Sequence, residues 1–138
     1  MDDLINNKYE DITFTEVQNN MFSDLVESDI ALKRVLMVIA KHSQTHKDNE
    51  VSGGITVKDI TEQIILDRKV RKGKKGFTTE TTYINRKHAE RVVETLLKMS
   101  LCYKVPFTHP SKLIYPTVRG ISVSKELTRR YLETSKGR

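Results

Sequence analysis

An apolar stripe in the second half of the chain places the strongest constraint on the fold. Between residues 79 and 100 the apolar side chains recur at spacings of three, one, three and one. They are Ala89, Val92, Val93, Leu96 and Leu97. This spacing is typical of an α-helix that buries one face. Because most other positions in the segment are polar or charged, the sequence predicts a long amphipathic helix over 79–100 with its opposite face in solvent.

Weaker patterns on both sides predict a mainly α chain of α+β class with a small β-hairpin. Apolar periodicity predicts further helices at 15–27, 30–41 and 57–66, and a last helix that begins at Ser122 or Ser124. Residues 101–107 and 113–118 are rich in β-forming side chains and are separated by a turn, which predicts the hairpin. A short strand is also expected at 51–55.

The charge of the chain is divided unevenly along its length. Residues 1–30 hold eight acidic residues and one basic residue, a charge of −7, whereas the other 108 hold 23 basic and 10 acidic residues, a charge of +13. A body this basic is attracted to polyanions, of which nucleic acid is the usual one. A surface that only keeps the protein soluble is the alternative. We expect an acidic flexible arm at 1–14, one domain at 15–134 and a tail at 135–138.

No arrangement of residues in the sequence is typical of an enzyme. The segment 73–78 does not match a phosphate-binding loop, and no serine or cysteine lies in a nucleophile motif. His42 and His46 have the spacing of two metal ligands on a helix but have no third ligand of suitable type nearby. The single Cys102 lies between apolar residues, which favours packing over reactivity. We therefore expect a non-enzymatic, cytoplasmic, nucleoid-associated protein without cofactor or metal.

The order of the expected elements is helix, short strand, helix, basic loop, long helix, hairpin and helix. The segments ITVKDITEQIIL, TTYINRKHAERVVETLLKMSLCYKV and KLIYPTVRGISVSKEL carry this order within residues 29–134. The chain resembles the winged helix-turn-helix superfamily and, within it, is most similar to MarR-type transcriptional regulators. The resemblance implies that the long helix lies in the major groove of DNA, that the hairpin (the wing, 101–118) contacts the backbone or minor groove, and that flanking helices form a homodimer.

Three features depart from that family pattern. About a dozen residues separate the two helices of the expected helix-turn-helix, where three or four are usual. The turn of the wing offers His109 and Lys112 in place of the usual Asp and Arg. The last helix is also short for a dimer interface, so the helix at 15–27 is expected to contribute to one.

The exposed side of the predicted helix carries the candidate groups for contact with DNA. Arginine and lysine can donate to guanine, asparagine can pair with adenine, and threonine can donate to phosphate. The candidates are Thr81, Thr82, Tyr83, Asn85, Arg86, Lys87 and Arg91. An ordinary solvated helix face is the alternative.

The segment 68–76 has the highest density of positive charge in the sequence. Its composition predicts a mobile loop, because it cannot bury a face. We expect it to contact the backbone or minor groove without reading sequence. Its six bases are Arg68, Lys69, Arg71, Lys72, Lys74 and Lys75.

Together these features predict a repressor-like transcriptional regulator that binds double-stranded DNA as a homodimer. A replication or partition factor of a plasmid or phage remains open within the same class. From another class, a winged-helix adaptor that binds protein through the helix at 15–27 also remains open. An RNA-binding role is a third alternative, although the sequence lacks an aromatic platform for single strands.

Overall fold

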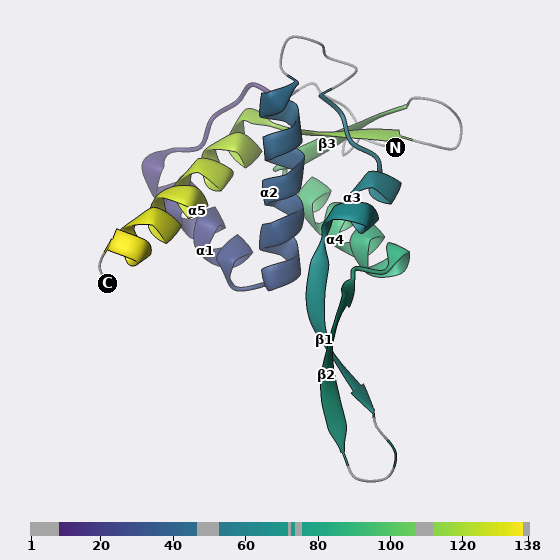
Figure 1. The fold of residues 1–138 in the computed structure, drawn as a ribbon. Coiled ribbons are helices and arrows are strands. Elements are labelled where there is room, and N and C mark those ends of the chain that lie inside the picture. The colour runs from purple at the N-terminus through teal and green to yellow at the C-terminus, as the bar shows by residue number, and fades with distance from the viewer. Residues whose placement is uncertain (1–8, 47–52, 72, 74–75, 107–111, 137–138) are drawn as a thin grey trace.

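Helix α2 (Ile30–Thr45) lies in the middle of the body and contacts helices on both sides (Figure 1). The computed structural model describes residues 9–46, 53–71, 73, 76–106 and 112–136. Within these ranges the chain forms five helices and two antiparallel two-stranded sheets. The other elements are α1 (Glu16–Glu27), α3 (Val57–Gln63), β1 (Ile65–Arg71), β2 (Phe77–Tyr83), α4 (Arg86–Lys98), β3 (Cys102–Pro106), β4 (Lys112–Pro116) and α5 (Val118–Lys136).

Polar side chains cap the starts of the first three helices. The Thr15 side chain accepts a hydrogen bond from the backbone of Gln18, whose own side chain accepts one from the Thr15 backbone. Thr56 and Asp59 form the same reciprocal pair at α3. Such caps satisfy amide groups that have no partner inside the helix. The prediction of a helix at 15–27 is confirmed.

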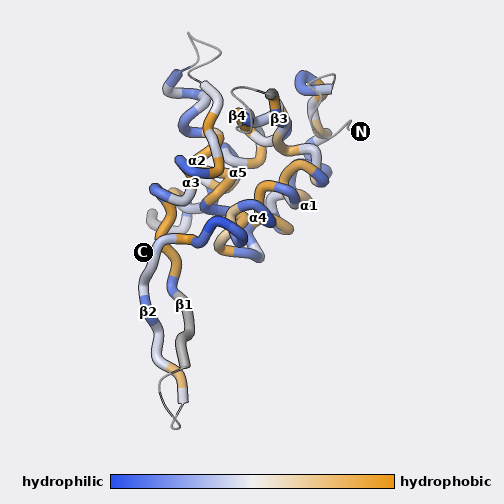
Figure 2. The backbone as a smooth tube through the Cα atoms, turned by 90° about the vertical axis from the view of Figure 1, so that its right-hand side faces the viewer, coloured by the Kyte–Doolittle hydropathy of each residue, from blue (hydrophilic) through white to orange (hydrophobic). Residues whose placement is uncertain are grey.

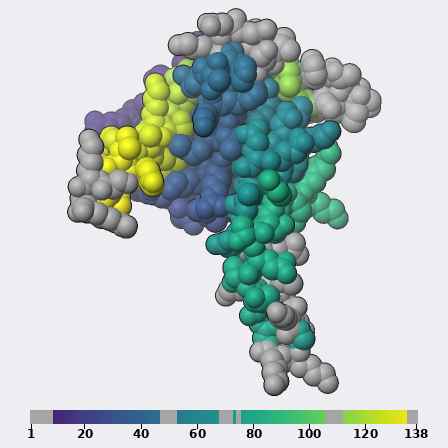
Figure 3. Space-filling model, in the orientation of Figure 1, coloured from purple at the N-terminus to yellow at the C-terminus, as the bar shows by residue number. Residues whose placement is uncertain are grey.

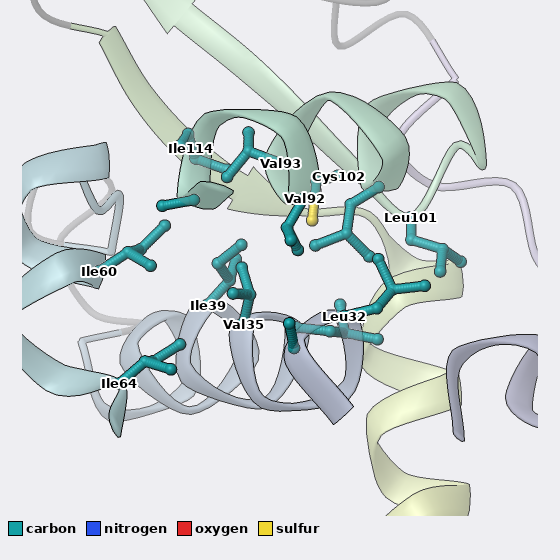
Figure 4. Close-up of a cluster of buried hydrophobic side chains, with 14 of the residues drawn as sticks. Leu32, Val35, Ile39, Ile60, Ile64, Val92, Val93, Leu101, Cys102 and Ile114 are labelled. Atoms are coloured by element: carbon teal, nitrogen blue, oxygen red, sulfur yellow. The ribbon is translucent and has the colours of Figure 1, made fainter. Parts of the chain in front are cut away.

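The hydrophobic core lies between α2 and α4 and is closed by α3 and β4 (Figure 4). Val35 and Ile39 of α2 are fully buried, and Val93 of α4 is 3% exposed. The predicted apolar stripe of α4 is buried at all five of its positions. The stripe therefore faces the core, as its spacing predicts.

The predicted helix over 79–100 is wrong in its first third. Residues 77–83 form strand β2, which pairs in antiparallel fashion with β1, and α4 begins only at Arg86. The sequence of β2, FTTETTY, is aromatic and β-branched, which favours a strand over a helix. The side chain of Asn85 accepts a hydrogen bond from the backbone of His88 and so fixes the start of α4.

The boundaries of three other elements also differ from the prediction. The helix predicted at 57–66 ends at Gln63, because the chain becomes extended at Ile64 and enters β1. The strand predicted at 51–55 is represented, among its described residues, by a single bridge between Ile55 and Ile114. The last helix begins at Val118, four residues before the earlier of its two predicted starts, and with 19 residues it is not the short helix expected.

The region predicted as a basic loop begins as a strand. Arg68, Lys69 and Arg71 belong to β1, so β1 and β2 form a two-stranded ribbon that extends away from the body (Figures 1 and 2). The ribbon begins at the end of α3 and returns at the start of α4. A hydrogen bond of 2.9 Å from the Ile84 amide to the Ile64 carbonyl joins its two ends. The ribbon is thus inserted between two helices that pack against each other.

Arg119 of α5 binds the chain that precedes α1. Its guanidinium donates to the backbone carbonyls of Tyr9, at 2.8 Å, and of Ile12. It also donates to the carbonyl of Ser100 at 3.1 Å and lies 5.9 Å from the centre of the Phe14 ring. Burial lowers the pKa of Arg119, and the nearby Asp11 carboxylate opposes this shift. These contacts hold the segment 9–14 against the body.

Candidate nucleic-acid interface

The exposed face of α4 is cationic. Lys87, Arg91 and Lys98 are all exposed, and they lie on the side of the helix opposite the buried stripe. Successive residues of a helix are separated by about 100°, so these three side chains form one ridge. Glu94 lies in the same ridge, between Arg91 and Lys98 along the helix, and forms a 4.0 Å ion pair with Lys104 of β3. The face keeps an excess of positive charge.

The first turn of α4 holds two of the predicted DNA-binding residues in local contacts. The side-chain oxygen of Asn85 accepts a 2.8 Å hydrogen bond from the His88 amide, so this oxygen caps the helix. Arg86 forms a 3.0 Å ion pair with Glu90, and both side chains are largely exposed. Exposed ion pairs of this kind contribute little stability, so Arg86 can exchange Glu90 for another anion at low cost.

A cleft of about 550 Å³ lies between α3, α4 and the β3–β4 hairpin. Lys58 and Arg86 line it from the two helices, and Lys104 and Lys112 line it from the two strands. Three carboxylates, those of Asp59, Glu90 and Glu94, line the same cleft. The cleft therefore brings together bases from four elements, including the predicted residues Arg86 and Lys112.

Thr81, Thr82 and Tyr83 lie on strand β2, so the prediction that they belong to the long helix is wrong. The Thr81 hydroxyl donates a 3.0 Å hydrogen bond to Asp67 across the ribbon. Thr82 is half-buried, and Tyr83 is 57% exposed at the root of the ribbon. Tyr83 is only two residues from Asn85, so it lies close to the first turn of α4, whereas Thr81 lies farther along the ribbon.

Several predicted residues lie outside the described ranges. His109 of the wing is one of them, and Lys72, Lys74 and Lys75 are the others. The structure describes the hairpin as two paired strands, Cys102–Pro106 and Lys112–Pro116.

Lys58 and Lys104 are not among the candidates that the sequence indicates. Lys98 lies on the helix face that the spacing predicts, and it extends the Lys87–Arg91 ridge by two helical turns. Lys58 and Lys104 come from segments far apart in the sequence, and only the packing of α3 and β3 against α4 brings them to the same cleft. No local pattern could have identified these two.

The structure also describes the surroundings of Cys102, His42 and His46. Cys102 is buried in the core, and burial raises the pKa of its thiol. The rings of His42 and His46 lie 4.5 Å apart between their centres. Within the described ranges, no group of three or more histidine, cysteine, aspartate or glutamate residues is arranged to hold a metal ion.

Comparisons with known proteins do not assign the chain to a family. No family model, no curated protein and no solved structure matches the chain. None of the helices in the described part of the chain combines the length and the apolar character needed to span a membrane.

Proposed function

We propose that this protein binds double-stranded DNA as a winged helix-turn-helix regulator and inserts α4 into the major groove. The observation that carries the proposal is the ridge formed by Lys87, Arg91 and Lys98 on the exposed side of a helix whose other side is fully buried. A major groove about 12 Å wide accepts one α-helix, and lysine and arginine donate to guanine and to phosphate there. Helix α4 therefore has side chains that can bind DNA, and its exposed side can approach the major groove.

The arrangement around α4 supports the same proposal. The elements α2, α3, α4 and the β3–β4 hairpin follow the order of a winged helix, and the bridge between Ile55 and Ile114 supplies the short strand that this fold places before its second helix. The ribbon β1–β2 occupies the position of the turn between α3 and α4, which accounts for the long spacing between the two helices. The hairpin serves as the wing, with Lys112 at its outer end.

The proposed partner chain is a second copy of this protein. Val17, Met21 and Leu25 of α1 are 78%, 50% and 50% exposed, and their spacing of four places them on one side of that helix. Helix α5, which packs against α1, exposes Tyr131 and Leu132. An apolar surface made by the outer helices is suited to a twofold contact between identical chains, since the same patch then covers itself.

A titration of duplex DNA tests the proposal. The full chain should bind a mixed-sequence duplex of about 30 bp, three helical turns, and each neutralised phosphate should contribute about 0.9 to the dependence of log affinity on log salt. The variant Lys87→Ala/Arg91→Ala should bind at least tenfold more weakly and with a smaller salt dependence. Fluorescence anisotropy at two salt concentrations measures both quantities.

A matched variant separates the ridge from general charge. Lys41→Ala/Lys125→Ala removes the same charge from a groove between α2 and α5. It should change the affinity by no more than about threefold, because exposed charges beyond a Debye length are largely screened. Equal losses in the two double variants would contradict a role for α4 in the groove.

A further inference from the structure

The β1–β2 ribbon holds an exposed phenylalanine at its outer end. Phe77 is 72% exposed, although the two other phenylalanines in the described ranges, Phe14 and Phe22, stack on each other with ring centres 4.5 Å apart. In the register of the ribbon, Phe77 is opposite Arg71, and this is the outermost of the seven residue pairs. Within the described part of the chain, Phe77 belongs to neither hydrophobic cluster.

The ribbon extends well beyond the body. Each strand has seven residues, which at about 3.3 Å per residue gives an arm of roughly 23 Å. The space-filling view shows the arm standing clear of the helical body (Figure 3). An isolated two-stranded ribbon is only marginally stable in water, so an arm of this kind is suited to binding a partner.

The chemistry of the ribbon selects nucleic acid as that partner. Arg68, Lys69 and Arg71 give β1 three positive charges, and β2 contributes four threonines, whose hydroxyls can donate to phosphate. The negative charges of the two strands are limited to Asp67, which binds Thr81, and Glu80. By sequence, the outer half of the ribbon is therefore rich in positive charge, and Phe77 is its one aromatic residue.

We propose that Phe77 is an apolar wedge, inserted from the minor groove between two stacked base pairs when α4 occupies the adjacent major groove. This inference rests on the proposed function. The ribbon leaves the body at the start of α4, so its outer end reaches across the phosphate backbone toward the neighbouring groove. That minor groove is only about 6 Å wide, and proteins that enter it commonly insert phenylalanine or another apolar side chain between base steps, which kinks the duplex and widens the groove.

A duplex that is already unstacked provides the test. The two probes are a mixed-sequence duplex of about 30 bp and the same duplex with a two-nucleotide bulge at its centre. Because the bulge has already lost stacking, the wild-type chain should bind it about tenfold more tightly than the intact duplex, a difference of about 1.4 kcal/mol. Phe77→Ala should bind the two probes with equal affinity, and Phe77→Leu should keep most of the preference.

The matched control removes an apolar side chain from the inner end of the same ribbon. Ile65 is 41% exposed and pairs with Tyr83, so Ile65→Ala should keep the tenfold preference. If the wild-type chain binds both probes equally, or if Phe77→Ala keeps the preference, the wedge is disproved while duplex binding stands. If neither probe binds at all, the proposed function fails as well.

Sedimentation of the free protein tests the remaining alternative, in which a second copy of the chain covers Phe77. If Phe77 instead contacts a second copy of the chain, Phe77→Ala will dissociate the protein in the absence of DNA. That result overturns the wedge, and an unchanged association state together with the loss of bulge preference supports it.

Discussion

At the scale of single residues, Arg130 joins the two helices at the edge of the molecule. Its guanidinium lies 2.9 Å from Asp24 and 3.0 Å from Glu27, both of α1, and 2.8 Å from Glu126 of its own helix. The Arg130 side chain is 22% exposed and that of Glu126 is 12% exposed, so these charges are less screened than an ordinary surface pair. The cluster therefore contributes to holding α1 against α5.

Glu126 makes the stability of the fold depend on pH. Hydrogen bonds from Arg129 and from Arg130 lower its pKa to about 2. Since this value lies below the 4.5 of an unperturbed carboxyl, the ionised group stabilises the fold at higher pH, and the contribution is lost as the pH falls from about 4.5 to about 2. Melting curves should show a gap between wild type and Glu126→Gln that is constant near neutral pH and closes over this interval. Glu133→Gln, at the more exposed end of the cluster, should give a much smaller gap.

Gly120 allows α5 to approach the end of α4. A β-carbon at this position would lie 2.1 Å from the carbonyl oxygen of Leu101, which accepts a hydrogen bond from the Thr117 amide. Gly120→Ala should therefore lower the free energy of unfolding by about 2 kcal/mol or more, because backbone must move to admit the methyl group. Urea denaturation measures this loss. Lys125→Ala, on the exposed side of the same helix, should change it by less than about 0.5 kcal/mol, and equal effects would contradict the steric explanation.

At the scale of elements, the ribbon β1–β2 is separable from the core. The hydrogen bond from the Ile84 amide to the Ile64 carbonyl already joins the two ends of the ribbon. Of the residues in its two strands, Leu66 at the base belongs to the hydrophobic core cluster, and the described cluster includes no other. Replacing residues 67–81 by an Asn-Gly turn should leave a folded protein, with a melting temperature lowered by no more than about 5 °C. Affinity for duplex DNA should fall and its salt dependence should decrease, because several phosphate contacts are removed.

Circular dichroism and anisotropy of the shortened chain check both parts of that prediction. A matched variant keeps the ribbon and replaces only Arg68, Lys69 and Arg71 by glutamine. It should reproduce the loss of affinity without any change of fold. A shortened chain that does not fold would show that the ribbon supports the core.

The elements differ in how much of them local sequence could predict. The stripe of α4 depends on residues that are close together in the sequence, so its spacing identified it. The ribbon was not predicted, because a lysine-rich segment resembles a solvated loop until its partner strand is known. Strand β2 was assigned to the helix because it directly precedes a strong helical stripe, although its threonines favour a strand. Pairing between strands is a non-local contact, and single-segment patterns do not contain it.

At the scale of the whole molecule, the exposed apolar side of α1 and α5 predicts self-association. Met21→Asp places a charge at the middle of the row Val17, Met21 and Leu25 and should convert a dimer into a monomer, because an unpaired buried charge is strongly unfavourable. Sedimentation equilibrium measures the mass directly. Asn20→Asp introduces the same charge one residue away on the same helix and should leave the dimer intact. A wild-type chain that is monomeric but still binds DNA would assign this face to a different protein.

The proposed dimer would also set the length of DNA that it binds. A twofold dimer places two copies of α4 on one side of the duplex, and their half-sites should then lie about one helical turn, 34–36 Å, apart.

The candidate site as a whole could be predicted only in part. Lys87 and Arg91 follow from the spacing of one helix, whereas the cleft with Lys58 and Lys104 requires the packing of three elements.

The contacts of Arg119 and Arg130 have a consequence for how the protein is made. They connect positions separated by 110 and 103 residues, such as Tyr9 with Arg119 and Glu27 with Arg130. At a translation rate of about 5–20 residues per second, the first helix is synthesised roughly 5–20 s before its partner helix. During that interval the side of α1 that carries Phe22 and Val26 faces water, and a chaperone that binds nascent chains has its best opportunity there.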